Sequence, residues 1–328
     1  MVVTTYNQDS YVPATIRSVL AQTFRDYELI VVDDGSTDGT VAQLRTFGNR
    51  LRLVQQPNQG VAASRNTGIR HARGTFVAFL DGDDIWEPEK LERQVRAAEA
   101  NPGSGLVAVD GVQFSGDEVV YGSLYPPEVR AQFVGDAPLS LACYEPFLRR
   151  NLVSTTSQVL VPRSVLDAIG PADQSFPIAN DWDLYIRIAA AYPVTFLPDK
   201  LMRWRYLATS ASGPELIRPL RWAKDHVAIL KKHERLAPAK YRPQVRALRV
   251  QKLRDTADAT YWYGRQVDAG WARRHLWTLV REHPLVPAPL AFLLALYLPR
   301  SIAHQTGRVA RAFRRLTSRR RVEGPLPR

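Results

Sequence analysis

The chain has 328 residues, 45% hydrophobic and 23% charged, which is the composition of a globular protein rather than a disordered one. This length predicts one large core with an appended region. The single cysteine, Cys143, excludes a disulfide framework and fits a reducing compartment. The opening residues read as a strand followed by polar residues, so we expect no secretory signal.

The charge is distributed unevenly. Residues 1–213 contain 19 lysines and arginines against 24 acidic residues, whereas residues 214–328 contain 25 against 8, a formal charge of +17. This asymmetry predicts a C-terminal region that meets an anionic surface. A pI near 10 would suggest nucleic-acid binding. No nucleic-acid module is visible, however, and the half with site-like motifs is acidic, so we expect no nucleic-acid partner.

The first hundred residues alternate short apolar strands with amphipathic helices. We predict strands at 2–5, 27–32, 51–55 and 75–80, and helices at about 9–21, 40–47, 60–72 and 88–100. Asp9 or Ser10 is expected to cap the first of these helices. Strands that alternate with helices predict a parallel α/β sheet with right-handed crossovers.

From residue 104 onward the pattern is mixed and then becomes helical. We predict strands at 106–109, 156–161, 194–197 and 201–206, and helices at 139–150, 181–191 and within 215–283. The helical region is expected to use four tryptophans as packing anchors, Trp222, Trp262, Trp271 and Trp277. These changes predict boundaries that separate residues 1–213, 214–284 and 285–328.

The last region is apolar and then basic. Residues 285–298 contain Pro287 and Pro289, and their uninterrupted part is shorter than the roughly 20 residues that span a bilayer. Beyond them, one helical face carries Ile302, Val309, Phe313 and Leu316 among many arginines. Two interpretations stay open: a core-packed stripe with a solvated basic face, or an interfacial helix on anionic lipid.

Two acidic turns about fifty residues apart carry the chemistry. Residues 31–39 (VVDDGSTDG) and 77–84 (VAFLDGDD) are apolar runs that end abruptly in carboxylates and glycine. Such runs read as strands buried on both faces. Ligands of open α/β sheets bind beyond the carboxyl ends of the strands. The two turns therefore predict a site for a metal and a polar ligand.

In the second turn, Asp81 and Asp83 would project to the same side if the segment is extended. Two neighbouring carboxylates repel unless a cation lies between them, and oxygen-only ligands favour Mg²⁺ or Mn²⁺. The alternative is a plain acidic turn in which Asp84 caps the next helix. In the first turn, a carboxylate can accept hydrogen bonds from a base or ribose. The alternative there is an Asx turn in which residues 36–38 cap a helix.

A third segment, residues 58–68 (NQGVAASRNTG), has glycine and small residues at a helix start, which lets a ligand approach closely. Arg65 can reach a phosphate from there. The alternative is a structural ion pair between Arg65 and one of the nearby aspartates.

In this order and spacing, six segments of the chain resemble the family-2 glycosyltransferases: 5–7, 18–23, 28–38, 58–68, 80–84 with Trp86 and Pro88, and 180–187. The resemblance covers roughly residues 1–212. It implies the GT-A fold, an α/β fold in which a Rossmann-like, mostly parallel sheet is flanked by helices, followed here by a helical C-terminal region. It also implies a nucleotide-sugar half at about 1–100 and an acceptor half at about 101–213.

The resemblance further implies an inverting hexosyltransferase-type enzyme. Such an enzyme moves a sugar from a nucleotide-diphosphate sugar, with a preference for UDP, to an acceptor hydroxyl of a polysaccharide, lipid-linked glycan or glycoconjugate. It implies a divalent cation, Mg²⁺ or Mn²⁺, held by Asp81 and Asp83, and Asp181 as catalytic base. One of Asp33 and Asp34 would contact the nucleotide's base. The residues implied in nucleotide-sugar binding are Thr5, Tyr6, Asn7, Asp33, Asp34, Asn58, Arg65, Asp81 and Gly82.

The chain departs from the family pattern at several positions. The first strand begins almost at Met1, so it is shortened or starts upstream, and Thr4-Thr5 replaces the usual proline. Asn180 stands where the family has the Glu of a Glu-Asp pair, and Leu207 where many relatives have a histidine. Asn180 suggests an alternative, a catalytically inactive sugar-nucleotide-binding or scaffold protein. Asp181 itself has a structural alternative as a helix N-cap, and Asp183 and Arg187 read as a surface pair.

Other classes fit less well. A nucleotidyltransferase would need a glycine-rich basic loop after the first strand, which residues 5–8 do not supply. Processive relatives carry Gln-x-x-Arg-Trp and membrane spans, whereas residues 200–204 keep only Arg203-Trp204 and no span follows. We therefore expect a non-processive enzyme in the cytoplasm, where the basic tail can bring it to the inner face of the cell membrane.

Overall fold

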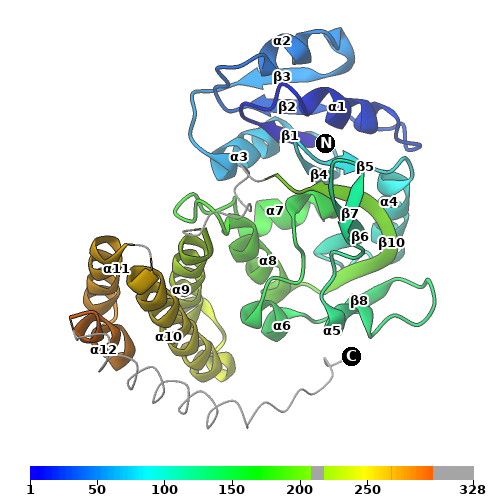
Figure 1. The fold of residues 1–328 in the computed structure, drawn as a ribbon. Helices are drawn as coiled ribbons and strands as arrows, with labels where there is room; N and C mark the ends of the chain where they lie inside the picture. The colour runs from blue at the N-terminus through cyan, green and yellow to red at the C-terminus, as the bar shows by residue number, and fades with distance from the viewer. Residues whose placement is uncertain (208–217, 267, 298–328) are drawn as a thin grey trace. The chain divides into compact units, whose positions relative to one another are not determined.

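The computed structural model describes residues 1–207, 218–266 and 268–297 (Figure 1). The chain divides at Pro214 into two compact units, an α/β unit before it and a helical unit after it.

The α/β unit begins with four parallel strands in the order β3-β2-β1-β4: β1 (Val2–Thr5), β2 (Ile30–Asp33), β3 (Arg52–Gln55) and β4 (Phe76–Asp81). Every residue of β1 and β2 is buried, as expected for strands covered on both faces. The register pairs Thr5 with Asp33 and Thr4 with Asp81. The two acidic turns therefore leave the sheet at the same edge, on either side of β1.

The connecting helices are α1 (Val12–Leu20), α2 (Thr40–Arg45), α3 (Val61–His71) and α4 (Lys90–Ala100), with a short 3₁₀ turn η1 (Gly48–Arg50) after α2. Helix α1 buries Val12, Ile16 and Val19 against the sheet. The predicted cap by Asp9 or Ser10 is wrong: Tyr11 is the N-cap residue and its side chain makes no capping bond. The carbonyl of Gln8 accepts from the first backbone amides instead.

The rest of the sheet follows the order β4-β9-β6-β10-β5, with β7 and β8 added to β6 and β10. Its strands are β5 (Ile85–Trp86), β6 (Leu106–Ser115), β7 (Glu118–Tyr121), β8 (Leu139–Leu141), β9 (Val159–Pro162) and β10 (Val194–Arg205). Strand β9 runs antiparallel to both β4 and β6, whereas β6 and β10 are parallel. The predicted α/β fold is confirmed, but the sheet is mixed rather than mostly parallel.

Two boundaries in this half differ from the prediction. The predicted strands 194–197 and 201–206 form one strand, β10, whose pairing with β6 shifts register between Leu197 and Met202. The predicted helix 139–150 starts late, because residues 139–141 pair with β10 as β8. The helices of this half are α5 (Pro127–Arg130), α6 (Tyr144–Arg149), α7 (Arg163–Ile169) and α8 (Asn180–Ala191).

The helical unit contains α9 (Arg218–Leu236), η3 (Ala239–Tyr241), α10 (Arg242–Gln266), α11 (Ala269–Glu282) and α12 (Pro287–Ala295). Its core includes Leu253, Leu276 and Leu293. Trp277 is 55% exposed, so the expectation that it anchors packing is wrong. None of the helices described here is long and apolar enough to cross a membrane. The predicted stripe from Ile302 to Leu316 lies outside the described residues.

Candidate active site

Strand β4 delivers the second acidic turn. The strand ends at Asp81, and the amide of Asp84 donates to the carbonyl of Asp81 at 3.0 Å. This bond closes a tight turn, so the expectation that residues 81–83 stay extended is wrong. Burial raises the pKa of Asp83, and the two carboxylates nevertheless remain close enough for the charge of Asp81 to add to this shift.

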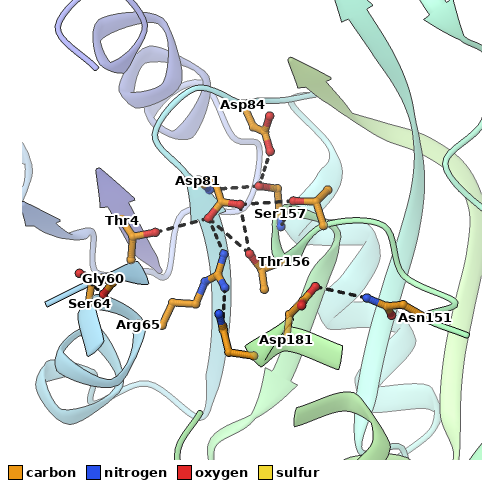
Figure 2. Close-up of polar contacts among 12 residues, drawn as sticks. Thr4, Gly60, Ser64, Arg65, Asp81, Asp84, Asn151, Thr156, Ser157 and Asp181 are labelled. Carbon is orange, nitrogen blue, oxygen red and sulfur yellow. Dashed lines mark hydrogen bonds and ion pairs between the residues drawn. The ribbon is translucent and has the colours of Figure 1, made fainter. Parts of the chain in front are cut away.

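Asp81 lies in a cage of donors (Figure 2). Its Oδ1 is 2.8 Å from Nη2 of Arg65. The hydroxyls of Thr4, Thr155 and Thr156 donate to its carboxylate over 3.3–3.4 Å. Its side chain is still 28% exposed. Asp81 is therefore held in one orientation while part of it faces solvent.

Arg65 connects the sheet to α8. The side chain is buried on α3 and donates from Nη2 to Asp81 (Figure 2). It also donates from Nη1 to Oδ1 of Asn180 at 2.9 Å. The structural alternative for Arg65, an ion pair with a nearby aspartate, is thus present. Asn180 accepts from the guanidinium as the carboxylate of a glutamate would, but without its charge.

Asp181 lies in the first turn of α8. The N-cap residue of this helix is Ala179, so the alternative that Asp181 is the N-cap is wrong. Asp181 is 8% exposed and accepts from Nδ2 of Asn151 at 3.3 Å. Burial raises its pKa to about 6, although the positive charge of Arg65 opposes the shift. The carboxyl is therefore ionised at neutral pH and is a stronger base than an ordinary aspartate.

A second pair on α8 also differs from the prediction. Nε of Arg187 lies 2.9 Å from Oδ2 of Asp183, so the predicted pair exists. The side chain of Asp183 is completely buried, however, so this is not a surface pair. The guanidinium of Arg187 also donates to the carbonyls of Ile169 and Pro171. The pair therefore fixes α8 against the segment that follows α7.

Asp83 and Asp84 have different surroundings. Asp84 is buried and accepts from the hydroxyl of Ser157 at 2.6 Å and from the amide of Arg205 at 2.9 Å, so its expected role as a helix cap is wrong. Burial raises the pKa of Asp84 well above its usual value. Asp83 is half-buried, and burial together with the charge of Asp81 raises its pKa to about 6. Nε of Arg205 donates to the carbonyl of Asp83 at 2.8 Å.

The two aspartates of the first acidic turn, Asp33 and Asp34, also have different surroundings. Asp34 accepts three bonds, from Nε2 of Gln56 at 2.7 Å, the amide of Gln59 at 3.1 Å and the amide of Gly60 at 2.8 Å. Within the described residues, Asp33 accepts only from the amide of Ser36, at 3.2 Å. Its other oxygen, Oδ1, is buried and has no hydrogen-bond partner among the described residues. Asp34 therefore holds the loop before α3, and Asp33 keeps a free acceptor.

The remaining predicted residues line or support this edge. Asn7, with φ of 51°, accepts from the amide of Thr37 at 2.8 Å and so holds the loop after β2. Tyr6 is 46% exposed and Asn58 is also exposed. The hydroxyl of Thr5 is 2.9 Å from Oε1 of Gln8.

Gly82 is buried in the turn between Asp81 and Asp83. A Cβ at this position would collide with Gln8 and Thr5. The turn therefore packs closely against the end of β1 only because residue 82 has no side chain.

The carboxylates of this edge suit a divalent cation only in part. No group of three His, Cys, Asp or Glu side chains that could hold a metal occurs in the part of the chain that the structure describes. Burial is the main cause of the raised pKa of Asp83, and repulsion from Asp81 adds to it. A hard cation between the two carboxylates would relieve this repulsion. Two carboxylates do not fill an octahedral shell, so phosphate and water oxygens would have to complete it.

Sequence reasoning missed the hydroxyl cluster that surrounds Asp81. The segment predicted as the start of a strand is the 3₁₀ turn η2 (Thr156–Gln158), with Thr155 as its N-cap. Its hydroxyls contact Asp81 and Asp84. The spacing of Thr155 and Gln158 is that of a capping box, which the structure contains and which could have identified the turn. No local sequence pattern identified Asn151 or Arg205 as residues of this site.

Comparison with known proteins places this geometry in context. Residues 1–152 match the family model described as Glycosyl transferase family 2. A putative teichuronic acid biosynthesis glycosyltransferase, TuaG of Bacillus subtilis, is 40% identical over 116 residues, 32% of this chain and 46% of the relative. The UDP-Glc:alpha-D-GlcNAc-diphosphoundecaprenol beta-1,3-glucosyltransferase WfgD of Escherichia coli is 41% identical over 97 residues, 29% and 38% of the two chains.

The chain spans only part of such relatives, from 29% to 66% of the length of the Rickettsia, Nostoc and Bacillus proteins that it matches. Among solved structures, residues 1–349 of S. aureus TarS superpose with a TM-score of 0.58 at 17% identity, covering 94% of this chain and 90% of that one. The mannosyltransferase PcManGT of Pyrobaculum calidifontis, in complex with GDP-Man and Mn²⁺, gives 0.54 at 22% identity, covering 90% and 84%. These structural likenesses show a shared fold.

Proposed function

We infer the function from the match of residues 1–152 to the family model described as Glycosyl transferase family 2 and from the fold that the chain shares with TarS and the mannosyltransferase PcManGT. We propose that it is an inverting, non-processive enzyme that transfers a sugar from a nucleotide-diphosphate sugar, a UDP-sugar, to an acceptor hydroxyl. The acceptor would belong to a polysaccharide, lipid-linked glycan or glycoconjugate. The names of TuaG and WfgD support a role in building cell-envelope polysaccharide.

One observation carries this proposal: the guanidinium of Arg65 joins the donor-side carboxylate Asp81 to the first turn of α8, where Asp181 lies. A donor held at the strand ends would thus have a buried base nearby. Asp181 would take the proton of the acceptor hydroxyl while the oxygen of that hydroxyl bonds to the anomeric carbon. The bond from that carbon to the diphosphate breaks in the same step, and the nucleoside diphosphate leaves. Displacement from the opposite face inverts the anomeric centre.

The other residues would bind the donor. Of the two aspartates in the first acidic turn, Asp33 is the better partner for the nucleotide's base. Oδ1 of Asp33 has no donor among the described residues, whereas Asp34 already accepts three bonds. Asp33 is only 1% exposed, so the nucleotide has to displace the side chains that now cover it. Asp81 and Asp83 would hold Mg²⁺ or Mn²⁺ together with the diphosphate. Such a cation neutralises charge on the leaving group.

Replacement of the base tests the proposal. Asp181→Asn should lower sugar transfer on the order of a hundredfold or more, because the amide cannot accept the proton. Binding of UDP, followed by calorimetry, should be unchanged, since Asp181 acts on the acceptor. Asp167→Asn, which changes an exposed aspartate of α7 in the same way, is the matched control. Unchanged transfer in Asp181→Asn would show that the base lies elsewhere.

We also propose that the enzyme works in the cytoplasm at the inner face of the cell membrane. The formal charge of +17 in residues 214–328 supports this place, because the inner leaflet is anionic.

A further inference from the structure

Helix α12 is apolar on every side but is buried on only one. Its sequence, PAPLAFLLA, contains no polar side chain. Leu293 is buried in the core of the helical unit, whereas Leu290 is 44% exposed and Leu294 59% exposed. Tyr297, in the turn that follows, is 67% exposed. A helix that is hydrophobic all round is normally covered on all sides, so the outer face of α12 lacks a partner among the described residues.

A row of side chains on α11 continues this face. Arg273 and Trp277 are one helical turn apart, and both are exposed. The guanidinium of Arg273 lies over the ring of Tyr297, 5.5 Å from its centroid, so the two rows adjoin. Leu285, in the connection between the helices, is 88% exposed. We call Arg273, Trp277, Leu285, Leu290, Leu294 and Tyr297 the α11–α12 face.

We propose that the α11–α12 face lies on the surface of an anionic lipid bilayer, with its leucines below the headgroups. Exposed Trp and Tyr beside leucines suit the boundary between headgroups and acyl chains. Arg273, and Arg281 one turn beyond Trp277, can keep their charges among lipid phosphates while their stems cover apolar surface. Helix α12 has nine residues, which suits a helix lying in the plane of the bilayer rather than crossing it.

Charge favours lipid over a second copy of the chain. Residues 269–297 contain three arginines and one glutamate. Two copies that met through this face would bring like charges together, whereas an anionic surface neutralises them. The inference does not depend on the proposed glycosyl transfer, because it concerns the helical unit and is tested by binding alone. It assigns the membrane contact to described residues, independently of residues 298–328.

A fluorescent label on the face provides the test. Cys143 is completely buried, so in the full-length chain an environment-sensitive thiol dye will attach to a cysteine introduced at an exposed site. We compare Leu294→Cys with Leu236→Cys, whose leucine is 61% exposed at the end of α9. With vesicles that contain phosphatidylglycerol, emission from residue 294 should shift to the blue and gain intensity, and emission from residue 236 should not. Pure phosphatidylcholine vesicles should give a much smaller change at both positions.

Other outcomes would overturn the proposal. If the protein floats with anionic vesicles while the label at residue 294 does not respond, another part of the chain makes the contact. A blue-shifted label before vesicles are added would mean that protein covers the face: a second copy if the shift depends on protein concentration, and another segment of this chain if it does not. No flotation and no shift at low salt would exclude membrane binding by this face.

Uncharged substitutions measure the apolar contribution separately. The double variant Leu290→Gln/Leu294→Gln should bind anionic vesicles about tenfold or more weakly than the wild type, because two leucines lose apolar contact at unchanged net charge. Leu236→Gln, an exposed leucine of the same unit, is the matched control and should bind like the wild type. Equal binding by the double variant would contradict insertion of α12.

Discussion

The two acidic turns look alike in sequence, and in both of them adjacent aspartates have different roles. In each pair the second aspartate supports the backbone, and the first accepts fewer hydrogen bonds from the described residues. Asp34 accepts three bonds from residues 56–60, and Asp84 is buried between Ser157 and Arg205. Asp33 keeps a buried oxygen that has no partner in the described part of the chain, and Asp83 is half-buried. A pair of neighbouring carboxylates is thus not one functional unit.

The supporting aspartates differ in the kind of partner that they have. Two partners of Asp34 are the backbone N–H groups of Gln59 and Gly60, which can only donate, and the third is the side-chain amide of Gln56. One partner of Asp84 is the hydroxyl of Ser157, which can either donate or accept. The same change from carboxylate to amide should therefore have different costs in the two turns.

The largest effect is expected from Asp83→Ala. If Asp83 is the available carboxylate of its turn, turnover should fall on the order of a hundredfold or more, because the cation on the diphosphate loses a ligand. The melting temperature should stay close to that of the wild type. The exposed Asp117→Ala is the control for loss of one negative charge. UDP affinity that is equal with and without EDTA would contradict a role for a divalent cation in nucleotide binding.

The next effect distinguishes Asp84→Ala from Asp84→Asn. Alanine leaves the amide of Arg205 and the hydroxyl of Ser157 without their buried partner, which should lower the free energy of unfolding by about 2–3 kcal/mol. Asparagine can accept from the amide and donate to the hydroxyl, so its cost should be well below that of alanine. Urea unfolding of the two variants measures the difference. Equal losses would mean that the carboxylate itself is needed.

In the first acidic turn, we expect that replacing the second aspartate, Asp34, by asparagine destabilises the protein. Asp34→Asn places an NH₂ group against the backbone N–H of either Gln59 or Gly60, which should cost about 1–2 kcal/mol of unfolding free energy. Asp33→Asn keeps an acceptor for Ser36 and should leave the stability nearly unchanged, while weakening UDP binding by roughly tenfold. Thermal melts and UDP calorimetry on both variants test this difference. An Asp33→Asn variant that is destabilised but binds UDP normally would contradict the prediction.

The smallest effect is a dependence of stability on pH. Because burial raises the pKa of Asp84 in the folded protein, the fold favours its protonated form. The contribution of Asp84 to the free energy of unfolding should therefore be fully present below about pH 4, the pKa of an aspartate in the unfolded chain. It should decline as the pH rises toward the pKa of Asp84 in the folded protein. Asp83 and Asp181, with pKa values of about 6, act in the same direction. The difference in unfolding free energy between wild type and Asp84→Asn, followed across pH 4–8, isolates the part due to Asp84.

Local patterns in the sequence determined the alternating strands and helices and the acidic turns at the strand ends. These features follow from the period of apolar residues and from where each run stops, so neighbouring residues are enough to identify them. The ordered motifs also indicated the resemblance to the family-2 glycosyltransferases, whose family model matches residues 1–152. The bounds of β10 and β8 were not predictable in this way, because pairing with distant strands overrides local preference.

The tertiary structure alone decided which carboxylate is available and what Arg65 contacts. The partner of Arg65 on α8 is 115 residues away, and the amide that holds Asp84 is 121 residues away. Nothing local in the sequence distinguishes Asp33 from Asp34 or Asp83 from Asp84. The physical reason is that a buried carboxylate is assigned by the donors that the fold brings to it, and those donors come from elements far along the chain.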